Sequence, residues 1–302
     1  MRVIDIRKSP RVQEGAKDFA PGQPWQLIIG VVLIVVAWPL AWFGPLAVSA
    51  FSFFPLWLGY ILTVDGFTLR RTGTSLIARD GRRFLLLFVF SIPLWWLFEF
   101  ANQYLQNWTY QQADRYTPFT YFALASIAFS TVMPAVFVTA EMYRGVGPLS
   151  SSRHWIRFVP TRKRLIAISV LGMAMFVASL IFPGVAFPLV WVGIFLLLDP
   201  INVLLGGKSL LSQVAEGRWD TILVLFAAAI TCGFFWEMWN FWSLPKWVYH
   251  VPYVGHPKIF EMPVLGFGGY FPFALEIFAF YNLVHTLIFR RRDTYLRLDE
   301  AA

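Results

Sequence analysis

The sequence contains few charged residues and a single cysteine. Only 14% of its 302 residues are Asp, Glu, Lys or Arg, whereas 58% are hydrophobic. A soluble globule of this size needs more polar surface, so the composition excludes an ordinary soluble protein and indicates a membrane protein. The one cysteine, Cys232, lies in an apolar run. It excludes an intrachain disulfide framework and a cysteine-based metal cluster.

Aromatic and basic residues are abundant by contrast. Aromatic residues make up 19% of the chain and include 14 Trp, a side chain that favours the boundary between lipid tails and headgroups. The formal net charge of +8 comes from short basic stretches between long apolar segments. Such stretches are typical of membrane topology determinants, so we expect the lipid bilayer and no nucleic acid as a partner.

Eight apolar runs are long enough to cross a bilayer. They span residues 27–43, 46–64, 84–100, 119–142, 165–182, 185–205, 221–242 and 267–289. Lipid offers no partner for a free backbone amide, so these runs must be helices. Short breaks at Gly44 with Pro45 and at Pro183 with Gly184 predict tight hairpins or, alternatively, re-entrant elements. The predicted fold is therefore all-α, a polytopic transmembrane helical bundle of about eight spans.

The basic residues also predict the orientation in the membrane. All but three of the 25 Lys and Arg residues fall on one side of this arrangement, and only Arg115, Lys246 and Lys258 fall on the other. This bias predicts a protein of the cell membrane with both termini on the cytoplasmic side. The first apolar run lacks a small-residue cleavage site, so we expect no cleaved signal peptide. We expect cytoplasmic segments at residues 1–24, 146–164 and 290–302, around membrane domains at 25–145 and 165–289.

The two membrane domains repeat one another in sequence. The aligned pairs, in order along the chain, are Phe54-Pro55-Leu56 with Phe187-Pro188-Leu189, Trp57 with Trp191, Asp65 with Asp199, Ser75 with Ser209, Glu99 with Glu237, Asn102 with Asn240, Trp108 with Trp247, and Tyr110 with Tyr249. Each copy holds an even number of spans, which predicts two tandem parallel four-helix repeats about a pseudo-two-fold axis along the membrane normal. The duplication serves either a site on this axis or only a stable helical body.

Three acidic residues near the external side are the candidate catalytic groups. Glu99 and Glu237 each precede an asparagine by three residues, which puts carboxylate and amide on one helix face. Glu276 occurs in the second copy alone, and close to Glu237 it would share a proton and supply a general acid. A carboxylate within a span usually faces the bundle interior or a wet cavity. Contact with water or a neighbouring helix end is the structural alternative.

The candidate substrate-binding residues surround these acids. They are Asn102, Asn240, Trp236, Trp247 and Tyr249. His250, His256 and Glu261 follow in the second external loop, but their spacing matches no zinc signature, so we expect no metal and no cofactor. The segment 261–270 is rich in Gly and Pro yet apolar. It is predicted to cover an external cavity as a lid, or simply to set the entry angle of the last span.

Three classes of function fit this pattern. The first is an enzyme that acts on a lipophilic small molecule, a lipid or isoprenoid, with Glu237 and Glu276 as acid or base. The second is a proton-coupled transporter, although no evident acid lies in the middle of a span. The third is a non-catalytic subunit that oligomerises or assembles with other membrane proteins. Recurrence of Glu with Asn favours a site over a purely apolar contact surface, and we expect that site in the second copy.

Overall fold

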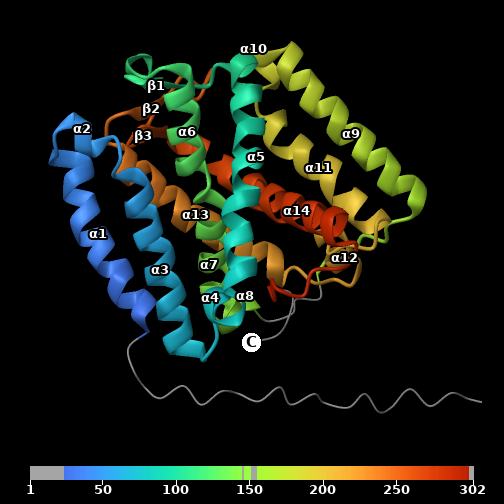
Figure 1. Cartoon of the computed structure of the whole chain (residues 1–302). Helices are drawn as coiled ribbons and strands as arrows, with labels where there is room; N and C mark the ends of the chain where they lie inside the picture. Colours follow the sequence, from blue (N-terminus) through green and yellow to red (C-terminus); the bar gives the residue numbers. More distant parts are fainter. Residues whose placement is uncertain (1–23, 145, 151–154, 299–302) are drawn as a thin grey trace, which may run out of the picture.

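The structure is a computed structural model that describes residues 24–144, 146–150 and 155–298. The described chain is mostly α-helical, as predicted (Figure 1). Most of the predicted N-terminal tail at residues 1–24, part of the linker at 146–164 and the last four residues of the C-terminal tail lie outside the described residues.

The elements follow one another as a chain of helices with two short ribbons. The first half, residues 24–150, contains α1 (Trp25–Phe43), α2 (Leu46–Ser49), α3 (Phe53–Thr72), α4 (Leu76–Arg79), α5 (Gly81–Leu105), β1 (Trp108–Gln111), η1 (Ala113–Arg115), α6 (Pro118–Phe129), α7 (Val132–Arg144) and α8 (Gly147–Ser150). The second half, residues 155–298, contains α9 (Arg162–Ile181), α10 (Pro183–Ala186), α11 (Leu189–Leu204), α12 (Leu210–Ala215), α13 (Asp220–Asn240), β2 (Lys246–Tyr249), β3 (Lys258–Ile259), β4 (Met262–Pro263), η2 (Val264–Gly269) and α14 (Tyr270–Phe289).

Six helical segments of the described chain are long and apolar enough to cross a membrane. They are Trp25–Phe43, Gly81–Leu105, Pro118–Arg144, Arg162–Ile181, Asp220–Asn240 and Val264–Phe289. Helix α11 is apolar but has 16 residues, and α3, which carries Asp65, Arg70 and Arg71, is not among the six. The chain is therefore a multi-pass membrane protein by helix length and composition, with six spans of this kind where eight were predicted.

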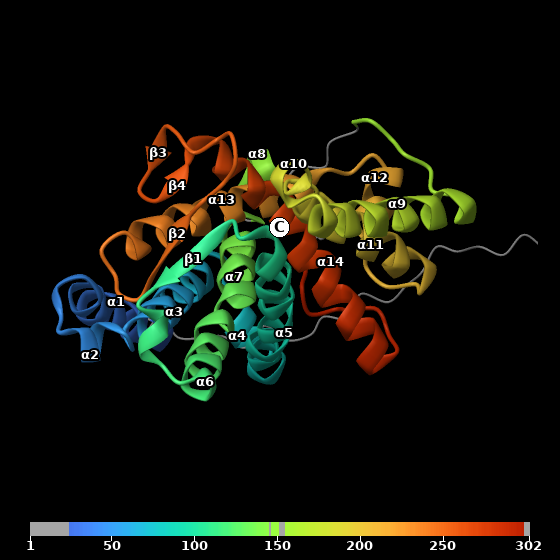
Figure 2. The same ribbon diagram turned by 90° about the horizontal axis from the view of Figure 1, so that it is seen from above.

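The outer helices expose apolar side chains. Val35 on α1 is 64% exposed, and Val170 and Ile181 on α9 are 63% and 62% exposed. Figure 2 shows α1 and α9 at opposite sides of the molecule, with α5, α7, α13 and α14 between them. An apolar surface of this extent is unusual on a water-soluble monomer, whereas lipid tails cover it without cost. The outer surface thus agrees with embedding in a lipid bilayer.

Glycines allow two helix pairs to pack with their backbones in contact. Helix α1 packs along α3, and α9 packs along α11 (Figure 1). A methyl group added at Gly30 would lie 2.7 Å from the carbonyl oxygen of Gly59, and one added at Gly172 would lie 2.6 Å from that of Gly193. Small residues at helix contacts are typical of membrane proteins, where close packing takes the place of the hydrophobic effect.

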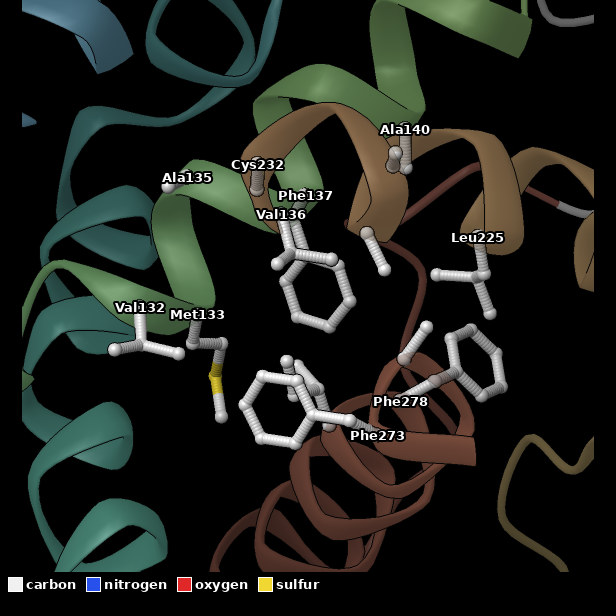
Figure 3. Close-up of a cluster of buried hydrophobic side chains, with 14 of the residues drawn as sticks. Val132, Met133, Ala135, Val136, Phe137, Ala140, Leu225, Cys232, Phe273 and Phe278 are labelled. Carbon is white, nitrogen blue, oxygen red and sulfur yellow. The ribbon is translucent and has the colours of Figure 1, made fainter. Parts of the chain in front are cut away.

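The core lies where α7 of the first half meets α13 and α14 of the second. Val136 and Phe137 come from α7, Cys232 from α13, and Phe273 and Phe278 from α14 (Figure 3). Each of these five side chains is at most 2% exposed. The two halves are therefore joined through one apolar cluster that neither half completes by itself.

The predicted run 119–142 is divided into α6 and α7 by Ser130 and Thr131. Ser91 on α5 repairs the break in the backbone hydrogen bonds. Its hydroxyl donates to the carbonyl oxygen of Phe129 at 2.5 Å and accepts from the amide of Met133 at 3.1 Å. Non-helical backbone at membrane depth requires such partners from the protein, because lipid supplies none.

Replacement of Gly172 by alanine is expected to lower the melting temperature in detergent. Inside a helix this change normally stabilises by up to about 1 kcal/mol, but overpacking at a tight contact costs about 1–3 kcal/mol. Gly184→Ala is the control, because a methyl group at Gly184 meets nothing within 4 Å. Equal melting temperatures for the two variants would show that the α9–α11 contact is not limited by glycine.

Candidate functional site

An antiparallel ribbon joins the two halves at one end of the molecule. Strand β1 pairs with β2, so that Trp108 lies opposite Tyr249 and Tyr110 lies opposite Trp247. Since Trp108 aligns with Trp247 and Tyr110 with Tyr249, exchanging the two strands leaves this register unchanged. The sequence did not predict the ribbon. We refer to this part of the molecule as the ribbon end and to the opposite part, where residues 293–298 pack, as the tail end.

The two predicted asparagines fasten the ribbon to the helix ends. The side-chain amide of Asn102 donates to the carbonyl oxygen of Trp108 at 2.8 Å, and that of Asn240 donates to the carbonyl oxygen of Trp247 at 2.8 Å. Their carbonyl oxygens accept from the backbone amides of the same tryptophans, at 3.3 Å and 2.9 Å. Asn102 and Asn240 thus position the ribbon.

Glu99 is held by three aromatic donors. Its Oε1 atom accepts from the indole Nε1 of Trp95 at 2.9 Å, from that of Trp108 at 3.2 Å, and from the hydroxyl of Tyr110 at 2.5 Å. Trp95 lies on the same helix one turn earlier, whereas Trp108 and Tyr110 lie on β1. The carboxylate therefore links α5 to the ribbon.

Glu237 has a related but different set of donors. Its Oε1 atom accepts from the hydroxyls of Tyr249 at 2.8 Å and Tyr270 at 2.7 Å, and the side chain is fully buried. Gly233 stands where the first half has Trp95, and a methyl group there would lie 2.6 Å from the Tyr270 ring. The missing side chain at Gly233 makes room for Tyr270, which takes the place of the tryptophan donor.

The tyrosines on the ribbon remain donors. Burial raises the pKa of Tyr110 well above its usual value, and the neighbouring charge of Glu99 raises it further. Burial raises the pKa of Tyr249 in the same way, with Glu237 as the neighbouring charge. A phenol with a raised pKa stays protonated, so both hydroxyls keep donating to their carboxylates at neutral pH.

A large aromatic cavity lies in front of these groups. Its volume is about 630 Å³, and its wall comes from both halves. The aromatic wall includes Trp95, Trp108 and Tyr121 from the first half and Trp191, Trp236, Trp247 and Tyr249 from the second. Three predicted substrate-binding residues, Trp236, Trp247 and Tyr249, therefore line one cavity. Glu99 and Glu237 stand behind their donors, outside the lining.

The segment 261–270 forms part of the cavity wall through Met262, Leu265 and Gly266. Lys246 on β2 holds this segment by donating to Glu261 Oε1 at 2.5 Å. His250 Nε2 lies 2.9 Å from the Thr109 hydroxyl on β1. Of the side chains considered as metal ligands, Glu261 thus connects the segment 261–270 to the ribbon, and His250 contacts the ribbon itself.

Glu276 occupies a different environment from Glu237. It is fully buried on α14, and neither of its carboxylate oxygens has a hydrogen-bond partner within the described part of the chain. It does not belong to the wall of the aromatic cavity, and the described hydrogen bonds of Glu237 go to tyrosines. The structure therefore does not join Glu276 and Glu237 by a hydrogen bond.

Trp95, Tyr121, Trp191 and Tyr270 are site residues that were not selected from the sequence. Trp95 could have been selected from the sequence, because a residue four positions before Glu99 lies on the same helix face. Trp191 matched Trp57 in the repeat, but Trp57 is fully buried whereas Trp191 faces the cavity. Tyr121 on α6 and Tyr270 at the start of α14 line the cavity because of how these helices pack in the folded protein.

The tyrosine–glutamate contacts are expected to be energetically coupled. Glu237→Leu leaves the hydroxyls of Tyr249 and Tyr270 without their acceptor. Each buried hydroxyl without an acceptor lowers the free energy of unfolding by about 1–3 kcal/mol. Glu237→Gln keeps an acceptor oxygen and is expected to lose less. In the Glu237→Leu background, Tyr270→Phe should cost much less than in the wild type, as measured by unfolding in detergent. Strictly additive losses would show that this hydrogen bond does not contribute.

Comparisons with protein-family models, with curated proteins and with solved structures give no match for this chain. Its function is therefore inferred from the cavity and from the groups that surround it.

Proposed function

We propose that the chain takes a lipophilic molecule of lipid or isoprenoid type into the aromatic cavity and acts on it as an enzyme. The observation that carries this proposal is the cavity itself, about 630 Å³ in volume and lined by tryptophan and tyrosine from both halves. Volumes of about 300–1,000 Å³ with mostly apolar walls and few polar groups are typical of small-molecule sites. Ring faces of tryptophan also stabilise developing positive charge.

The chemistry is assigned to Tyr249 and Glu237. Tyr249 lines the cavity and donates to Glu237, and Tyr270 does the same from the start of α14. In this proposal the phenol oxygen takes a proton from the bound molecule while its own proton passes to the carboxylate. Glu237 is then the proton acceptor behind the tyrosine, and Glu99 with Tyr110 is the matching pair in the first half.

We infer that the two halves are tandem repeats related by a two-fold axis through the ribbon. The ring of Trp57 lies 5.0 Å from that of Trp236, and the ring of the aligned Trp191 lies 5.0 Å from that of Phe98. At the tail end Asp65 accepts from Ser75 at 2.8 Å, and the aligned Asp199 accepts from Ser209 at 2.8 Å. Matching contacts in matching order support the repeat over independent packing.

The eight-span arrangement is part of the same proposal. Helices α3 and α11 each pack along an apolar partner, α1 and α9, so they traverse the same depth. With eight spans, the distribution of Lys and Arg puts the tail end and both termini on the cytoplasmic side of the cell membrane. The cavity then lies at the external leaflet.

Transport is the second candidate, supported by buried polar atoms on α11 and α14. Glu276, Asn282 and Thr286 of α14 and Asn202 of α11 all have buried oxygens without a described hydrogen-bond partner. Polar groups of this kind inside a bundle are costly and are typical of ion or proton pathways. A transporter would move its substrate across the membrane unchanged, whereas an enzyme would convert it.

A photoactivatable farnesyl analogue is expected to label the cavity wall of the protein in nanodiscs, in competition with unlabelled farnesol. Ala128→Trp should weaken this labelling, because Ala128 lines the cavity and an indole ring would occupy part of it. Labelled peptides are identified by mass spectrometry.

Ile127→Trp is the matched control, since Ile127 is the neighbouring residue on α6 and is 47% exposed on the outside. Equal labelling of the two variants would contradict binding in the cavity. An enzyme would convert bound farnesol chemically, whereas a binding protein would leave it unchanged. Conversion should be lost in Glu237→Gln and less affected in Glu99→Gln.

Cysteine labelling tests the orientation. After replacement of the buried Cys232, cysteines at Asp114 and Tyr253 should react with a membrane-impermeant maleimide added outside intact cells. Asp114 and Tyr253 are exposed at the ribbon end, whereas Thr72 is exposed at the tail end. A cysteine at Thr72 should react after permeabilisation alone. Labelling of a cysteine at Thr72 from outside intact cells would show that the protein has the opposite orientation.

A further inference from the structure

A second, smaller cavity lies at the tail end between α5 and α14. Its volume is about 180 Å³. Its wall combines apolar side chains with cationic ones, namely Leu86, Phe90 and Phe289 with Arg82, Arg83 and Arg291. Guanidinium groups bind phosphate through paired hydrogen bonds, and apolar walls accept hydrocarbon. The cavity thus has the chemistry of a site for an anionic amphiphile.

The buried acid Asp293, which contacts Tyr281 and His285 of the cavity wall, has its own hydrogen-bond donors. Asp293 accepts from the hydroxyl of Tyr281 at 3.2 Å and from the backbone amides of Tyr295 and Leu296 at 3.1 Å and 2.9 Å. It also lies 3.5 Å from His285 Nε2. This carboxylate is therefore satisfied by groups of the C-terminal segment and α14.

The cationic rim faces the outside of the molecule. Asp80 caps α5 by accepting from the backbone amides of Arg82 and Arg83, and it pairs with the Arg83 side chain at 3.4 Å. Arg82 and Arg291 are exposed at the rim. The Nδ1 atom of His285, on the cavity wall and 4% exposed, makes no well-aligned hydrogen bond within the described residues.

The cavity also borders the lipid-facing surface. Leu85 on α5 is 63% exposed, and Leu287 and Ile288 on α14 are 59% and 57% exposed. These side chains flank residues of the cavity wall on both helices. The apolar wall of the cavity is therefore accessible from the surrounding bilayer, next to the arginines.

We propose that this cavity binds the phosphodiester headgroup of an anionic phospholipid. The guanidinium groups of Arg82 and Arg291 contact the phosphate, and one acyl chain lies along Leu86, Phe90 and Phe289. Basic pockets between membrane helices are suited to anionic headgroups. Helix α5 belongs to the first half and α14 to the second, so the bound lipid holds the halves together at the tail end, opposite to the ribbon.

Native mass spectrometry and thermal unfolding of the whole protein test this site. Phosphatidylglycerol is expected to bind and to raise the melting temperature relative to phosphatidylcholine. In Arg82→Gln with Arg291→Gln, affinity for phosphatidylglycerol should fall about tenfold or more, because the phosphate loses its charge-assisted hydrogen bonds to both guanidinium groups. Leu86→Trp keeps all charges but narrows the cavity beside its apolar wall, and it should lose most of the same stabilisation.

Arg162→Gln with Lys163→Gln is the matched control, because these residues begin α9 at the tail end, are exposed and lie outside this cavity. It removes the same charge and should keep the affinity within about twofold, because exposed charges away from the bound phosphate are screened by salt. An equal loss in the control would show diffuse surface attraction and overturn the proposal. So would full binding by Leu86→Trp, or equal stabilisation by inorganic phosphate.

Discussion

Glu99 and Glu237 are carboxyl groups inside a membrane protein that take hydrogen-bond donors from the protein, and the ribbon end is organised around these contacts. Glu99 and Glu237 obtain their donors mainly from aromatic side chains on β1, β2 and the start of α14. Each contact fixes a ring as well as a proton. A row of tryptophan and tyrosine rings is thereby held in place as the wall of a cavity, with the acids behind it.

The same requirement explains how the two halves differ. In the first half Trp95 on α5 supplies one donor to Glu99, and its indole occupies the position that corresponds to Gly233. In the second half Gly233 leaves that space to the ring of Tyr270, which belongs to the last helix. The second half therefore connects its carboxylate to the lid segment, which ends at Tyr270. This difference makes the surroundings of Glu237 more dependent on tertiary structure than those of Glu99.

Periodicity and composition predicted the helical architecture because long apolar runs in lipid have few alternatives. The breaks at Gly44 and Pro183 and the polar positions Glu99 and Glu237 were also legible in the sequence. The ribbon was not, because β1 and β2 are four residues each and their paired residues are 135 or more positions apart in the sequence. The sequence therefore marked Asn102 and Asn240 as polar site residues, whereas their observed contacts hold the ribbon. Trp191 and Tyr270 were missed because their place in the cavity depends on how the halves pack.

The central claim is that the two halves enclose one site for a lipophilic molecule. An electron cryo-microscopy map of the protein purified in nanodiscs from its native membrane tests this most directly. The account predicts elongated density between Trp95, Trp191 and Trp247, in the cavity that the two halves line. A map in which side chains collapse into this space, or in which Trp191 faces lipid instead, would contradict the claim.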